Sequence, residues 1–105
     1  MATSTVKTLF KPVTVTMDSG TVANYAKQEE KFVFGMLALS PGVIPARTWT
    51  GVAYISPAPK TAINCNGMTG NVANALVEIK ANGRVSVYCA DQADYIVFAL
   101  AYETN

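Results

Sequence analysis

The sequence predicts an all-β protein, an antiparallel β-sandwich or a jelly-roll-like barrel, and three observations lead to that class. Residues 75–81 and 84–90 alternate apolar and polar side chains on either side of Asn82-Gly83, as two half-buried strands joined by a turn do. Further short segments of strand character are separated by clusters of Gly, Pro, Ser, Asn and Asp, which is typical of sandwiches and barrels. Residues 95–102 are apolar throughout, so both faces of that strand need cover.

The expected strands follow one another along the chain with turn-forming clusters between them. They are residues 13–17, 31–39, 51–56, 61–65, 75–81, 84–90 and 95–103. Residues 22–32 lack a sustained 3.6-residue apolar period, so we expect a loop there with at most one turn of helix. Residues 1–12 are expected to be an N-terminal arm or linker, and residues 13–105 a single β-sandwich domain.

The register of the hairpin around Asn82 follows from its pattern. A two-residue turn at Asn82-Gly83 would place apolar residues opposite polar ones along both strands. A three-residue loop, 81–83, with Gly83 in the left-handed conformation, gives one apolar face instead. The resulting pairs are Lys80 with Arg84, Ile79 with Val85, Glu78 with Ser86, Val77 with Val87 and Ala75 with Cys89. The like-charged first pair costs about 1 kcal/mol at most, which is small beside the burial of five or six apolar side chains at about 1.5 kcal/mol each.

Two of the expected strands are apolar on both faces. Alternate residues of 31–39 form the sets Phe32, Phe34, Met36, Ala38 and Val33, Leu37, Leu39, and residues 95–102 divide in the same way. One set of each strand can fill the interior. The other set needs a partner surface, which a symmetric homo-oligomer supplies. The alternative is that both strands lie centrally in a three-layer fold or beneath loops of the same chain.

The few charges and the short apolar stretches argue against nucleic acids and membranes as partners. Only 14% of the residues are charged, the net charge is +1, and the cations form no stripe, so we expect no nucleic-acid binding through phosphates. Gly, Ser and Pro interrupt the apolar stretch 32–46, which is too short to span a bilayer. We therefore expect no membrane insertion and, without a secretory signal at the start, synthesis in a cytoplasm.

The sequence offers little for catalysis. It contains no histidine, which removes the usual triads and most metal sites. Cys65 and Cys89 have no basic neighbour in sequence and are expected to be free, unreactive thiols. Asp91 and Asp94 form a close acidic pair, but they suit a polar loop better than a glycosidase site. We therefore expect that the protein is not an enzyme and that it binds no metal and no cofactor.

A series of features along the chain carries a resemblance to a known family. These are the apolar strand 31–39, Thr48-Trp49 before the next strand, the prolines of 56–60, the pattern Val-x-Ile-x-x-x-Gly-x-Val-x-Val over 77–87, and the final aromatic strand. Their order resembles the β-sandwich head domains at the tips of bacteriophage tail fibres and receptor-binding proteins, over about residues 13–105. The resemblance implies a homotrimer in the virion, attached to other tail components, that recognises glycans or other structures of the host bacterial surface.

Glycan binding requires an aromatic side chain on which the sugar can stack and a few hydrogen-bonding groups in a shallow site. Trp49 is the only tryptophan and lies near Arg47, and the loops 66–71 and 91–95 are rich in polar groups. The candidate ligand-binding residues are Arg47, Trp49, Asn66, Asp91, Gln92, Asp94 and Tyr95. The alternatives are that Trp49 is a buried structural residue, that Arg47 pairs with an acid, and that both loops are ordinary solvated turns. A purely structural trimerising cap, or a capsid or tail decoration protein without a ligand, is the second functional hypothesis.

Overall fold

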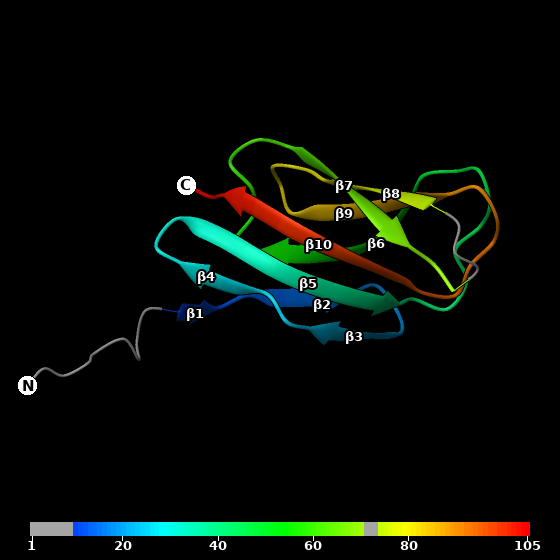
Figure 1. Ribbon diagram of the computed structural model, residues 1–105, viewed down its shortest axis with the longest axis horizontal. Helices are drawn as coiled ribbons and strands as arrows, with labels where there is room; N and C mark the ends of the chain where they lie inside the picture. Colours follow the sequence, from blue (N-terminus) through cyan, green and yellow to red (C-terminus); the bar gives the residue numbers. More distant parts are fainter. Residues whose placement is uncertain (1–9, 71–73) are drawn as a thin grey trace, which may run out of the picture.

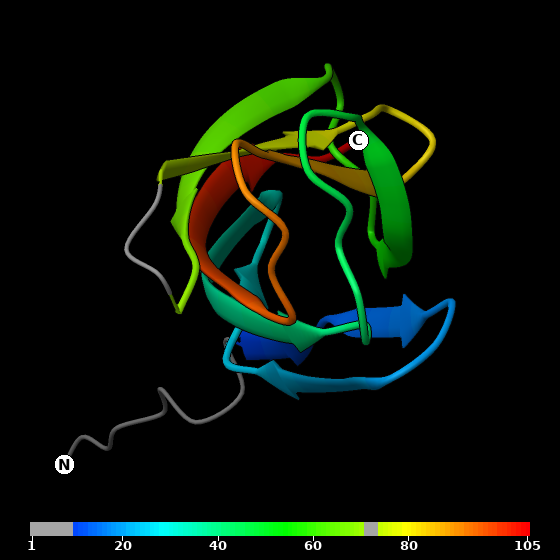
Figure 2. The same cartoon turned by 90° about the vertical axis from the view of Figure 1, so that its right-hand side faces the viewer.

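The computed structural model describes residues 10–70 and 74–105 and confirms the all-β prediction. One antiparallel sheet curls into a nearly closed barrel (Figures 1 and 2), and the described residues contain no helix. The strands are β1 (Phe10–Pro12), β2 (Thr14–Met17), β3 (Thr21–Asn24), β4 (Lys27–Glu29), β5 (Phe32–Ser40), β6 (Thr50–Ser56), β7 (Ile63–Met68), β8 (Asn74–Ile79), β9 (Arg84–Cys89) and β10 (Ile96–Glu103). Their order across the sheet is β1-β4-β5-β10-β7-β8-β9-β6-β2, and β3 pairs with β5.

The predicted hairpin has the register that its pattern indicated. β8 and β9 pair Ile79 with Val85, Val77 with Val87 and Ala75 with Cys89. Gly83 adopts a φ of 91°, and its N–H donates to the Lys80 carbonyl at 2.8 Å. The paired apolar side chains are fully buried. The prediction of a three-residue loop is therefore confirmed, together with the face that each strand turns to the interior.

The expectation of a loop over residues 22–32 is wrong, because β3 and β4 both pair with the long strand β5. Asn24 lies opposite Leu37, and Lys27 lies opposite Phe34. Each of these strands has four residues or fewer, too few to show a period, and they are held by pairing with β5, which follows them in the chain, rather than by their own strand preference. The Asn24 amide also donates to the Val13 carbonyl at 2.8 Å, which ties β3 to the chain beside β2 where the barrel closes.

Two other boundaries differ from the sequence interpretation. β7 begins and ends later than the expected 61–65, because Asn66, Gly67 and Met68 continue the strand opposite β8. An added Cβ at Gly67 would lie 2.8 Å from the Ile96 side chain, so this glycine permits a close approach within a sheet rather than a turn. Phe10–Pro12 of the expected arm forms β1, which pairs with β4. Residues 1–9 of that arm lie outside the described residues.

The interior of the barrel takes one apolar set from each of the two-sided strands. Val33, Leu37 and Leu39 of β5 are buried, as are Ile96, Phe98, Leu100 and Tyr102 of β10. The opposite set of β5 is open to solvent, with Met36 47% exposed. Loops of the same chain therefore do not cover this set among the described residues. None of the described residues forms a helix long and apolar enough to cross a membrane.

Candidate functional site

Trp49 lies on the outside of the barrel, directly before β6. Its side chain is 48% exposed, so the alternative of a buried structural tryptophan is wrong. The indole ring lies 5.6 Å from the ring of Tyr88 on β9, at an interplanar angle of 48°. The Tyr88 side chain supports one side of the indole and leaves about half of it free. A half-open, braced aromatic ring is a suitable platform for the apolar face of a sugar.

Hydrogen-bonding side chains lie beside this aromatic pair on the outer face of β7, β8 and β9. Residues directly opposite one another in a sheet point to the same side. Asn66 lies opposite Leu76, which lies opposite Tyr88, and the next row joins Asn64, Glu78 and Ser86. None of these four polar side chains has a hydrogen-bond partner among the residues that the structure describes. We use the name Trp49 surface for Trp49 and Tyr88 together with these four polar residues, Asn64, Asn66, Glu78 and Ser86.

Arg84 and Asp18 form an ion pair next to the Trp49 surface. The Arg84 guanidinium donates to both carboxylate oxygens of Asp18, at 2.8 and 2.7 Å, and lies 4.6 Å from the ring centre of Tyr54. An added Cβ at Gly51 would lie 2.3 Å from Arg84 Nη2, so the glycine leaves room for the guanidinium. The pair lowers the pKa of Asp18 and raises the pKa of Arg84. Because Asp18 neutralises Arg84, this flank of the Trp49 surface carries little net charge.

We expect Asp18→Asn to remove a stabilisation that the wild type has only above acidic pH. The hydrogen bonds from Arg84 hold the pKa of Asp18 below its ordinary value of 3.8, so the unfolded state binds the proton more readily. The stabilisation is therefore present above the unfolded pKa and is lost as the pH falls through the folded pKa. The effect is small and salt-sensitive, because the pair is exposed.

Urea unfolding at neutral pH and at about pH 2 measures this difference. The wild type is expected to be more stable than Asp18→Asn at neutral pH and equal to it in acid. A difference that persists unchanged in acid would contradict the assignment of the stabilisation to this ion pair.

The loops at one end of the barrel hold most of the other predicted site residues. The segment after β5 runs beside the segment before β10 (Figure 1), where the Ile44 N–H donates to the Ala93 carbonyl at 2.7 Å. Gln92 and Asp94 line a shallow hollow of about 260 Å³ with Val43 and Ala93. Asp91 is exposed beside them. This hollow is polar, but it contains no aromatic ring to support a sugar.

The predicted residues therefore divide into two groups. Trp49 and Asn66 belong to the outer wall made by β6 to β9, although Asn66 lies in β7 and not in the expected loop. Asp91, Gln92 and Asp94 belong to the loop end, and Tyr95 directly precedes β10 there. Arg47 has a φ of 58° and donates its backbone N–H to the Cys89 carbonyl at 2.7 Å. The Arg47 side chain forms no ion pair among the described residues, so the alternative that it pairs with an acid of the same subunit is not found there.

The sequence interpretation missed Tyr88, Glu78, Ser86 and Asn64. The signal for them was present, because they are the outward positions of strands whose register the pattern fixed, in line with Asn66. Arg84 and Asp18 are 66 residues apart, and no local pattern connects them.

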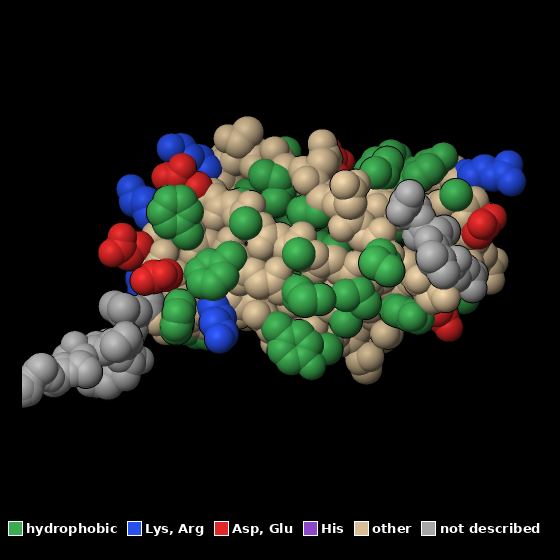
Figure 3. All heavy atoms as spheres, viewed as in Figure 1, with side chains coloured by type: hydrophobic (Ala, Val, Ile, Leu, Met, Phe, Trp, Pro, Cys, Tyr) green, Lys and Arg blue, Asp and Glu red, His purple; other side chains and the backbone are tan. Residues whose placement is uncertain are grey.

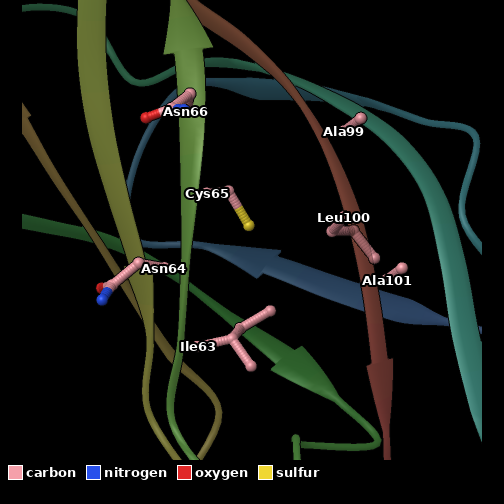
Figure 4. Close-up of a pocket in the computed structure, with 7 residues that line it drawn as sticks. All are labelled: Ile63, Asn64, Cys65, Asn66, Ala99, Leu100 and Ala101. Atoms are coloured by element: carbon pink, nitrogen blue, oxygen red, sulfur yellow. The ribbon is translucent and has the colours of Figure 1, made fainter.

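A groove opens in the wall of the barrel where β7 and β10 separate. The two strands pair only at Met68–Val97 and Gly67–Phe98, and beyond these pairs lies a space of about 420 Å³. Cys65 and Ile63 point toward β10, while Asn64 and Asn66 point away from it (Figure 4). Burial raises the pKa of the Cys65 thiol, which keeps it protonated at neutral pH and a poor nucleophile. The groove could therefore hold a small group, but its thiol is not reactive.

Comparison with known proteins does not identify the chain. No protein-family model matches the sequence, and no curated protein matches it. The site must therefore be interpreted from its own chemistry. Among the described residues no cluster of three or more His, Cys, Asp or Glu side chains could hold a metal ion.

Proposed function

We propose that this chain is a non-enzymatic recognition domain, which binds a carbohydrate of a bacterial surface through the Trp49 surface. The observation that carries the proposal is the half-exposed Trp49 ring, braced by Tyr88 at 5.6 Å beside a row of hydrogen-bonding side chains without protein partners. Such a face binds sugars by stacking on the ring and by hydrogen bonds to hydroxyl groups. Glu78 is the charged side chain of the Trp49 surface, so the face favours a neutral sugar over an acidic one.

The setting that we propose is the tip of a bacteriophage tail fibre or baseplate. The order of strands, tryptophan, proline loop and hairpin resembles the head domains found there, and the all-β barrel is compatible with it. In that setting the domain is a homotrimer in the virion, made in the host cytoplasm and attached to other tail components. It contacts the host surface without inserting into the membrane.

Trp49→Ala is expected to weaken carbohydrate binding by about tenfold or more, because a lost aromatic stacking contact amounts to about 1.5 kcal/mol. The measurement is titration calorimetry with purified surface polysaccharide from the bacterium to which the protein adsorbs. Tyr25→Ala is the matched control, since Tyr25 is an exposed aromatic residue that follows β3 on another wall. Equal affinity of the wild type and Trp49→Ala would contradict the site.

A structural cap or decoration subunit without a ligand is the second candidate function. The apolar outer face of β5 favours it, because such a face suits assembly and needs no ligand. Adsorption of the purified protein to host cells separates the two functions. A recognition domain adsorbs and is displaced by soluble polysaccharide, whereas a cap does not adsorb.

A further inference from the structure

The outer face of β5 and β10 carries more exposed apolar side chains than an ordinary soluble surface. Met36 of β5 lies opposite Ala99 of β10, and Phe34 lies opposite Ala101. All four side chains are open to solvent. Ala38 and Val97 continue the face in the next row. We call these six residues the β5–β10 face.

Apolar side chains extend this face on both sides. Phe32 lies at the end of β5 beyond Phe34 and is 57% exposed. On one side the ring of Phe10 meets the ring of Phe34 edge-on, with the ring centres 6.1 Å apart. On the other side Met68 of β7 lies opposite Val97 and is exposed. In the space-filling view, hydrophobic side chains continue across the middle of the molecule (Figure 3).

We infer that a second copy of this chain covers the β5–β10 face. Phe10, Phe32 and Phe34, which are 53%, 57% and 36% exposed, together offer roughly 300 Å² of apolar area. With the methionines and alanines the patch reaches roughly 600 Å², at the upper limit for a monomer. A stable contact between two proteins buries about 800 Å² on each partner. The patch and a narrow polar rim are therefore large enough for such a contact.

The charges around the face favour a copy of the same chain over another partner. None of the six residues of the β5–β10 face is charged, so a partner can cover it without removing a charge from water. Charged side chains gather at the ends of the molecule in this view (Figure 3). At one end Lys27 lies opposite Phe34 and Glu29 lies opposite Phe32. A rim that carries both signs can pair with itself across a symmetric contact, whereas a strongly acidic or basic partner would meet like charges.

This inference deepens the proposed function, since it names the surface through which the proposed oligomer forms. β6, which Trp49 directly precedes, and β9, which carries Tyr88, lie on the other side of the barrel from β5 and β10 (Figure 2). Copies that pack through the β5–β10 face therefore leave Trp49 and Tyr88 open. Self-association does not depend on the ligand, so the proposed interface and the proposed recognition function can each be contradicted without the other.

The test is sedimentation velocity at micromolar concentration with two exposed residues changed to lysine. Met36→Lys places a charge in the middle of the β5–β10 face, and Leu76→Lys places the same charge on β8. Met36 and Leu76 are each 47% exposed, so the two changes are equally easy for the folded chain to accept. Ala99→Lys, opposite Met36, is a second variant of the face in case Met36→Lys fails to fold. Circular dichroism and thermal unfolding check the fold of each variant.

The wild type and Leu76→Lys are expected to sediment as oligomers with the same dissociation constant. Met36→Lys and Ala99→Lys are expected to raise that constant by about tenfold or more and to release monomers. A monomeric wild type, or a Leu76→Lys variant that dissociates as readily as Met36→Lys, would overturn the inference. Carbohydrate binding by a monomeric wild type would overturn this interface and leave the recognition function standing.

Discussion

Replacing Gly83 by alanine is expected to destabilise the protein by about 4 kcal/mol, among the largest effects of any single methyl group in this chain. Gly83 has a φ of 91°, a conformation that an L-residue with a Cβ adopts only with strain. An added Cβ would also lie 2.5 Å from the Ile55 carbonyl oxygen on β6. This approach is fixed, because the Ile55 N–H donates to the Gly83 carbonyl at 2.9 Å. Alanine at 83 must therefore move the hairpin loop away from β6 or distort its backbone.

Gly42→Ala is the matched control for this change. Gly42 has a φ of 106°, and an added Cβ there meets no atom within 4 Å. The control therefore carries the backbone strain without the clash, and we expect a loss of about 1–2 kcal/mol. Urea unfolding followed by Trp49 fluorescence measures both variants, at one fixed protein concentration because oligomers unfold in a concentration-dependent way. Equal losses would show that the contact with Ile55 contributes nothing.

The parts of the fold that the sequence predicted are those in which neighbouring residues carry the information. The β8–β9 register depends on two adjacent segments and a glycine at a fixed offset, so the pattern determined it. The two-sided character of β5 and β10 is equally local. The outward position of Phe34 and Met36 follows once Leu37 is placed in the core.

The missed parts depend on strand pairing and side-chain packing that the pattern of their own residues does not show. β3 and β4 exist because β5 is long enough to pair with both of them, and their own residues show no period. Asn66 and Gly67 are residue types that favour turns, yet they pair with Leu76 and Ala75 of β8 and so belong to β7. The exposure of Trp49 was undecided for the same reason, because the neighbour that braces it, Tyr88, is 39 residues away in the chain. The Arg84–Asp18 pair is also non-local.

Ile79→Ala is expected to lower the free energy of unfolding by about 3–4 kcal/mol, while Leu76→Ala in the same strand costs less than about 1 kcal/mol. The two side chains have the same number of carbons, and both belong to β8. Ile79 is fully buried and lies between Ile63 of β7 and Val85 of β9, so its removal leaves a cavity in the barrel. Leu76 points outward beside Tyr88 and loses only a partial contact.

The comparison tests which face of the β8–β9 hairpin belongs to the core, a point on which the placement of every outward residue depends. Urea unfolding of both variants at the same protein concentration supplies the measurement. A Leu76→Ala variant as unstable as Ile79→Ala would contradict the register, because the outer face would then be buried as deeply as the core. In that case the Trp49 surface could not be open to a ligand. A large difference between the two variants leaves Asn66, Tyr88 and Ser86 on the solvent side, where the proposed recognition requires them.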